Sequence, residues 1–174
     1  FNRYTNNPSS GLSQDYNINY RQKFKKPQQL LSVESNYSIN NNQSTSIYQQ
    51  ENFWENYQEI NPYWFYQNNI SNTDFSINTN TIDFESPLFK NGKIESGLKN
   101  TNREIDNDFY SETFNNTVGN FVADDSLNNR FVYNENIYAA YTSYGQTIGK
   151  WSYKAGLRAE QANTKSTLIN NDSS

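Results

Sequence analysis

The strongest constraint on the fold of this chain is the segment 151–160, in which apolar and polar side chains alternate without a break. Its odd positions, from Trp151 to Ala159, are apolar, and its even positions, from Ser152 to Glu160, are polar, charged or glycine. Successive side chains of a β-strand point to opposite faces, so this segment predicts a strand with one apolar and one charged face. Soluble sandwiches and membrane barrels both contain such strands, and the spacing of turns separates the two.

Turn signals are far apart in this sequence. They occur at residues 25–29, at 90–93, which contain Asn91-Gly92, and at 146–150. Asn-Gly is the strongest short hairpin signal, because both residues tolerate positive φ. A soluble β-sandwich turns about every 8–12 residues, whereas long polar stretches near 40–72 and 104–130 separate these turns. The pattern predicts an antiparallel transmembrane β-barrel with short periplasmic turns and long extracellular loops, in the bacterial outer membrane.

The composition fits a barrel wall better than a disordered chain. The mean hydropathy is −1.03 and only 33% of residues are hydrophobic, but 16% are aromatic, and disordered chains are poor in aromatic residues. No stretch approaches the ~18 apolar residues of a transmembrane helix. A net charge of −4 argues against a nucleic-acid partner. Because the chain has no His and no Cys, we expect neither an enzyme nor a cofactor or metal site of the usual zinc type.

Alternating segments predict six strands, at residues 14–24, 30–41, 73–85, 93–105, 131–145 and 151–164. Within 73–85, Phe75 and Ile77 have the opposite parity to Ile82 and Phe84, so a β-bulge is predicted near 79–81. Single-chain bacterial barrels have at least eight strands, and open sheet edges are not tolerated in lipid. We therefore expect residues 1–174 to form part of one larger barrel domain.

The same alternation predicts which side chains face lipid and which face the lumen. The predicted lipid-facing residues are Tyr16, Ile18, Tyr20, Leu31, Val33, Ile137, Tyr141, Trp151, Tyr153 and Leu157, and strand 131–145 is expected to turn Phe131, Tyr133 and Ala139 the same way. The predicted lumen-facing residues are Arg21, Lys23, Lys154, Arg158 and Glu160. The lumen-facing set either contacts a plug or a ligand, or is simply solvated and paired across strands.

Two further groups of residues lie in the predicted loops. The aromatic residues Phe53, Trp54, Tyr57, Tyr63, Trp64 and Tyr66 either contact a sugar or a partner protein at the barrel mouth, or extend the strands and form the outer aromatic girdle, which we favour. The acidic residues Asp106, Asp108, Glu112, Asp124 and Asp125 either bind calcium or, as we prefer, keep the loops solvated.

Three runs of sequence resemble a known family. Residues 92–99 with Arg103 and 105–108, residues 131–141, and residues 153–161 are similar in order and spacing to the outer-membrane β-barrel of TonB-dependent receptors in Bacteroidota, over most of 14–165. The resemblance implies a barrel of 22 strands with a plug domain, and energy from TonB for uptake of a large nutrient such as a siderophore, a glycan or a peptide. It implies as partners outer-membrane lipid, the rest of the barrel, and a surface lipoprotein or other outer-membrane subunit.

Two other functions stay open at this point. One is a structural or accessory barrel subunit of a larger outer-membrane complex. The other is a soluble, secreted, β-rich adhesin, which would be extracted without detergent.

Overall fold

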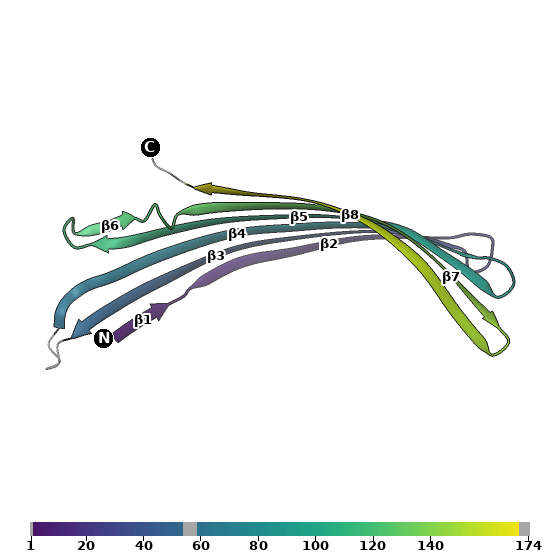
Figure 1. Cartoon of the computed structure of the whole chain (residues 1–174), viewed down its shortest axis with the longest axis horizontal. Coiled ribbons are helices and arrows are strands. Elements are labelled where there is room, and N and C mark those ends of the chain that lie inside the picture. The colour runs from purple at the N-terminus through teal and green to yellow at the C-terminus, as the bar shows by residue number, and fades with distance from the viewer. Residues whose placement is uncertain (1, 54–58, 171–174) are drawn as a thin grey trace.

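The computed structural model describes residues 2–53 and 59–170, which form one antiparallel sheet (Figure 1). Its strands are β1 (Asn2–Asn6), β2 (Ser9–Lys23), β3 (Leu30–Phe53), β4 (Glu59–Pro87), β5 (Gly92–Asn115), β6 (Asn120–Ala123), β7 (Asn129–Ile148) and β8 (Trp151–Asn170). Strands β1 and β2 both pair with β3, and β6 pairs with the end of β5. The long strands therefore lie side by side in chain order, from β2 to β8. None of the described residues forms a helix long and apolar enough to cross a membrane.

The short turns gather at one end of the sheet, where the sequence predicts them (Figure 1). Asn91 has a φ of 60° immediately before β5, and Gly149 has a φ of 62° in the two-residue turn before β8. The positive φ of Gly149, at the first position of its turn, matches the right-handed twist of the flanking strands. The six predicted strands are confirmed, and at this end their boundaries agree with the structure to within three residues.

The stretches 40–72 and 104–130, predicted to be long loops, are largely strand. Strand β3 continues to Phe53 and pairs with β4 from Glu59 onward, and the chain beyond β5 folds back as β6. Polar side chains join these extensions across strands: Gln67 Nε2 donates to Ser111 Oγ at 3.0 Å, and Asn68 Nδ2 to Glu112 Oε1 at 3.1 Å. The prediction was wrong because Asn, Gln, Ser and Thr carry no apolar alternation, although they pair well in a sheet.

The register of the sheet assigns every strand residue to one of two faces, since paired residues share a face. We call them the Leu157 face and the Arg158 face, after two neighbouring residues of β8. Across β8, β7, β5, β4, β3 and β2, one row of the Leu157 face consists of Leu157, Thr142, Ser96, Phe84, Leu31 and Gln22. The adjacent row of the Arg158 face consists of Arg158, Tyr141, Gly97, Asp83, Ser32 and Arg21.

The polarity of the two faces reverses along the strands. In the turn-proximal half, within about 9–11 residues of the short turns, the Leu157 face is rich in apolar side chains: Tyr16, Ile18, Tyr20, Leu31, Val33, Ile82, Phe84, Ile94, Leu98, Trp151, Tyr153 and Leu157. In the remaining tip half, this face is mostly polar, with Asp74, Ser76, Asn78, Asn102, Glu104, Asp106, Asn134 and Asn136. There the apolar side chains lie on the Arg158 face: Phe75, Ile77, Ile105, Phe109, Phe131, Tyr133 and Ile137.

This reversal corrects two predictions. The register between β3, β4 and β5 is continuous through residues 73–87, so the bulge predicted near 79–81 is absent. The apolar residues of β4 change from odd to even positions because the apolar side chains move from one face of the sheet to the other. Ile137 and Tyr141, grouped by sequence with the lipid-facing residues, lie on the Arg158 face, as do Phe131, Tyr133 and Ala139. The sequence pattern treats the apolar odd positions of β7 as continuing the stripe that contains Leu157. The register shows that these side chains lie on the opposite face of the sheet.

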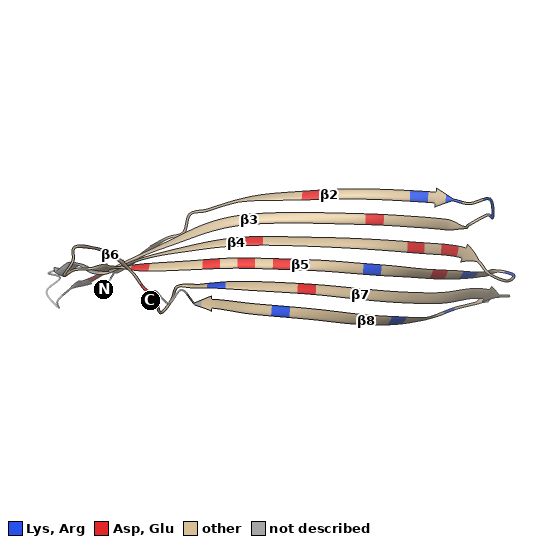
Figure 2. Cartoon of the chain, turned by 90° about the horizontal axis from the view of Figure 1, so that it is seen from above, with Lys and Arg blue, Asp and Glu red and all other residues tan. Residues whose placement is uncertain are grey.

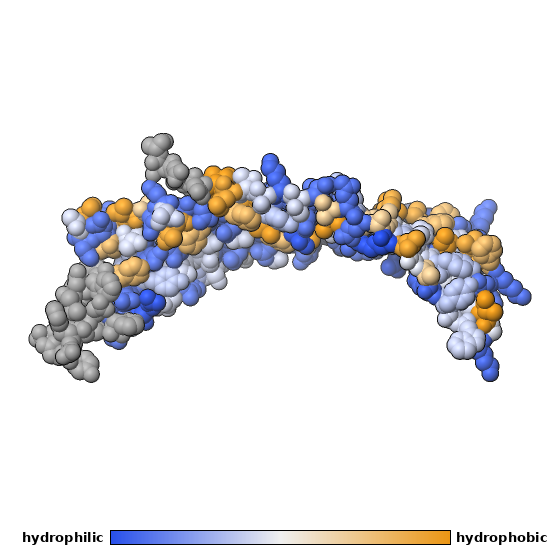
Figure 3. All heavy atoms as spheres, viewed as in Figure 1, coloured by the Kyte–Doolittle hydropathy of each residue, from blue (hydrophilic) through white to orange (hydrophobic). Residues whose placement is uncertain are grey.

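The described part of the chain forms one layer without a hydrophobic core of its own. Among the described side chains, Ala139 is the buried hydrophobic one, whereas Trp151 is 82% and Leu157 80% exposed. Figure 3 shows apolar and polar side chains interspersed over the surface. Apolar surface exposed to this extent marks contact with a membrane or with another protein.

Candidate functional site

The Arg158 face carries rows of polar and charged side chains through the turn-proximal half. The row that contains Arg158 ends at Arg21 on the far side of the sheet, with Asp83 and Tyr141 between them. Figure 2 shows charged residues distributed over all the long strands. Polar side chains repeated at alternate positions of every strand make this face suited to water.

Tyr141 is the centre of a group of contacts across strands on this face. It lies opposite Gly97, and its hydroxyl donates a hydrogen bond to Asp83 Oδ1 across two strands. A Cβ at Gly97 would lie 2.4–2.5 Å from Asp83 Oδ1 and the Tyr141 ring, so only glycine leaves room for this ring. The Arg158 guanidinium lies 5.6 Å from the centroid of the Tyr141 ring, within cation–π range.

A network of ion pairs lies nearer the short turns. Lys93 Nζ is 2.6 Å from Glu85 Oε2 and 2.9 Å from Glu95 Oε1, and Lys154 binds the second oxygen of Glu95. Exposed single pairs contribute little, about 0–1 kcal/mol, but several charges that share partners hold one another in position. The network therefore connects β4, β5 and β8 through charges of alternating sign.

The five predicted lumen residues share the Arg158 face but differ in their surroundings. Lys154 belongs to the ion-pair network, and Arg158 donates to Glu160 Oε2 through Nε at 3.0 Å and Nη2 at 2.7 Å. Arg21 and Lys23 lie exposed on β2, the strand at the other side of the sheet. Sequence reasoning did not bring Asp83, Gly97 and Tyr141 together as one site. Their contact depends on the pairing of β4, β5 and β7, which leaves no signal in the sequence.

An aromatic cluster lies at the tips of the long hairpins. The Tyr66 ring is 4.9 Å from the Phe121 ring, which is 5.4 Å from Phe114. Of the other predicted aromatic contacts, Trp54 and Tyr57 lie outside the described residues, as do the side chains of Phe53, Tyr63 and Trp64. Tyr66 is thus packed within the extended sheet, and Phe114 and Phe121 are members that sequence reasoning missed.

A buried polar contact anchors β6 beside this cluster. The amide of Ser111, which is fully buried, donates to Asn128 Oδ1 at 2.6 Å, and Ser111 O accepts from the amide of Asp124 at 2.8 Å. These bonds hold the segment that follows β6 against β5.

The acidic residues predicted as a calcium alternative are separated in the structure. No group of three potential metal ligands is found among the described residues. Asp106 instead accepts from Arg130 Nε at 2.8 Å and Nη2 at 2.5 Å. Asp124 Oδ1 accepts from the amide of Ser126 at 3.2 Å, within a turn.

The Asp106–Arg130 pair, in the tip half, predicts a pH dependence. The Arg130 hydrogen bond lowers the pKa of Asp106 below its ordinary value. A lowered pKa in the folded state contributes stability that is present above the unfolded value of about 3.9 and is lost as pH falls through the folded pKa. Hydrogen exchange of the β5 and β7 amides around this pair should therefore lose protection as pH falls below about 4, beyond the intrinsic effect of pH. The variant Arg130→Gln should lack this loss, and an identical pH response in both proteins would contradict the assignment.

A comparison with known families places the chain among membrane barrels. The model of a family described as "Outer membrane protein beta-barrel family" matches residues 22–174. No curated protein matches the chain.

Proposed function

Because the chain belongs to the outer membrane protein beta-barrel family and is located in the bacterial outer membrane, we propose that it forms part of the wall of a TonB-dependent transporter. The transporter takes up a large nutrient such as a siderophore, a glycan or a peptide. Residues 1–174 contribute six long strands, and further strands complete the barrel, which has 22 strands in the receptors that the sequence resembles. Because the chain contains no His and no Cys, we propose no enzymatic activity for it.

In this proposal the Leu157 face contacts lipid and the Arg158 face lines the lumen. The apolar turn-proximal half of the Leu157 face supports the first assignment, and the charged rows opposite support the second. The short turns lie on the periplasmic side, as in other barrels of this membrane. The tip half, polar on the Leu157 face, extends beyond the bilayer.

The observation that carries the proposal is the predominantly polar and charged lining of the Arg158 face in the turn-proximal half. Arg21, Asp83 and Arg158 lie in one row, and Glu85, Glu95 and Lys93 lie close by. A lining of this kind accepts water and a charged plug surface, because it presents both cations and anions, several of which form ion pairs. The plug and TonB are therefore the expected partners, with a surface lipoprotein at the mouth.

Uptake by the full-length protein in its own cells tests the proposal. Cells with and without the gene are given labelled ferric siderophores, oligosaccharides and peptides, with and without a protonophore. At least one of these substrates should enter only in cells that have the gene, and the protonophore should abolish its entry. Gene-dependent uptake that persists with the protonophore would contradict energy coupling.

A structural or accessory subunit is the second candidate function. The extended tips favour it, because the Tyr66–Phe121–Phe114 cluster and β6 present a folded surface outside the bilayer. It predicts that deletion of the gene lowers the amount of other outer-membrane proteins and that no substrate is taken up through this barrel.

A further inference from the structure

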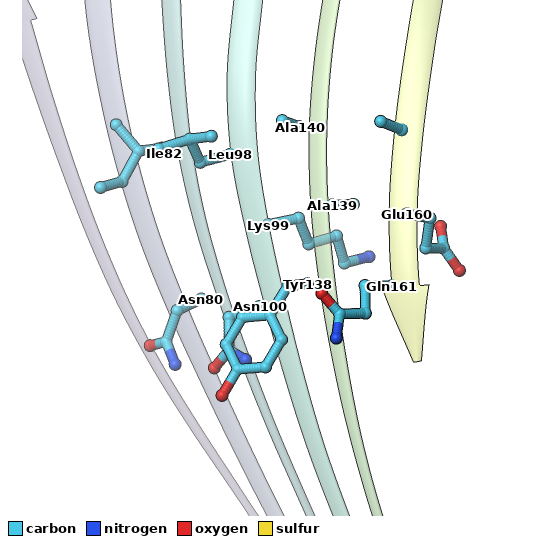
Figure 4. Close-up of a pocket in the computed structure, with 11 residues that line it drawn as sticks. Asn80, Ile82, Leu98, Lys99, Asn100, Tyr138, Ala139, Ala140, Glu160 and Gln161 are labelled. Carbon is cyan, nitrogen blue, oxygen red and sulfur yellow. The ribbon is translucent and has the colours of Figure 1, made fainter. Parts of the chain in front are cut away.

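A shallow apolar groove runs along the Leu157 face over β4, β5, β7 and β8 (Figure 4). Two adjoining hollows of about 540 and 710 Å³ form it, and they share Ile82, Leu98, Ala140 and Ala159. These four residues are one row of the sheet, because each pairs with the next. The two alanines leave the surface low over β7 and β8, beside the larger side chains of β4 and β5.

The polar side chains of the groove are concentrated at one end, because at the other end only Ser96 and Thr142 of this face are polar, and their hydroxyl groups hydrogen-bond to each other at 2.7 Å. The next row toward the tips consists of hydrogen-bonding side chains, namely Asn80, Asn100, Tyr138 and Gln161. Figure 4 shows this row beside the apolar row of Ile82 and Leu98. Lys99 and Glu160 also border the groove, but the register places them on the Arg158 face. On its own face the groove therefore has an apolar floor and an uncharged polar end.

The groove is short enough to lie within one leaflet. Two intervals of two residues separate its three rows, which at about 3.4 Å per residue span about 14 Å along the strands and, at a tilt near 45°, about 10 Å of a hydrocarbon core of about 30 Å. In β8 it extends from Leu157 to Gln161, in the part of the crossing farther from the short turn. With the short turns in the periplasm, this is the outer leaflet.

We propose that the groove binds one acyl chain of an outer-leaflet lipid whose uncharged, hydroxyl-bearing head group hydrogen-bonds to the row of Asn80, Asn100, Tyr138 and Gln161. The inference rests on the proposed orientation of the Leu157 face toward lipid. The apolar floor matches the acyl chain, and amide and phenol groups match hydroxyl groups. A phosphate head group is instead bound by Lys or Arg, and the register puts neither in the three rows of this face.

Lipid retention by the purified full-length protein tests the proposal. Native mass spectrometry is used to compare two probes with identical acyl chains, a glucosyl diacylglycerol and a phosphatidylglycerol. The wild-type protein should retain one glucosyl lipid in preference to phosphatidylglycerol. Ala159→Leu fills the groove and should lower this retention about tenfold. Ala155→Leu is the matched control, because Ala155 lies on the same face of the same strand, outside the groove, and should leave retention unchanged.

Either of two results would overturn the proposal: equal retention by Ala159→Leu and Ala155→Leu, or preference for phosphatidylglycerol in the wild-type protein. Neither depends on transport. The orientation of the sheet is tested separately by the stability of the variant Leu157→Arg in a bilayer. If that variant is destabilised as expected but the wild-type protein retains no glucosyl lipid, only the proposed lipid site is refuted.

Discussion

Leu157→Arg is expected to lower the stability of the barrel in a bilayer by about 2–4 kcal/mol, the cost of a cation on the lipid face near the midplane. Leu157 is 80% exposed on the Leu157 face and lies near the middle of the membrane crossing of β8. In the proposed orientation, lipid tails surround this side chain, and an arginine there has neither water nor a counter-ion. The free energy of unfolding in lipid bilayers, together with the yield of folded protein in the outer membrane, measures the effect.

Ser143→Arg is the matched control for this charge. Ser143 lies at the same depth, since it pairs with Gly156, but it belongs to the Arg158 face. Its Oγ is 3.4 Å from Glu95 Oε2, so a new cation would meet a carboxylate and the hydrated lumen. We expect a far smaller loss of stability there. Equal losses for the two variants would show that the faces are assigned wrongly.

Gly97→Ala should destabilise the fold by about 1–3 kcal/mol, the usual cost of overpacking, although it adds one methyl group. The new Cβ would lie 2.4 Å from Asp83 Oδ1 and 2.5 Å from the Tyr141 ring. The ring must then leave the strand surface, which breaks the hydrogen bond from Tyr141 to Asp83 and removes the platform under Arg158. Denaturation in bilayers measures the loss, and near-ultraviolet circular dichroism reports on the tyrosine.

Gly145→Ala provides the comparison for Gly97→Ala. Gly145 lies on the same face of the neighbouring strand, and the nearest atom to a Cβ there would be 3.5 Å away, an ordinary contact. An alanine at this position restricts the unfolded chain and should be neutral or stabilising by up to about 1 kcal/mol. Opposite signs at the two glycines are expected, and a loss of the same size at both would mean that Tyr141 packing is not the cause.

The strands near the short turns were predictable because two local signals coincide there. Asn91-Gly92 and Gly149 fix the turns by their backbone preferences, and the adjacent segments alternate strictly, as in Trp151 to Glu160. The distant ends of β3, β4 and β5 were not predictable in this way. Their side chains are Asn, Gln, Ser and Thr, whose sheet partners lie on other strands.

The charged site was predictable in type but not in arrangement. Alternation alone identified Lys154, Arg158 and Glu160 as one face. It could not show that Tyr141 belongs with them, because the apolar set of β7 changes face along the strand. Only the register with β5, which puts Tyr141 opposite Gly97, reveals that this tyrosine covers a glycine on the Arg158 face.

In the proposed orientation, the reversal of polarity between the two halves of the sheet sets the position of the protein along the membrane normal. Moving the wall inward would immerse Asp74, Asp106 and Asn134 in hydrocarbon, and moving it outward would lift Leu31 and Leu157 into water. Because hydrophobic mismatch costs free energy for every ångström of displacement, the barrel cannot adjust to a thicker bilayer by moving along the membrane normal. It should instead make the surrounding lipid conform to its own span and concentrate in patches of matching thickness.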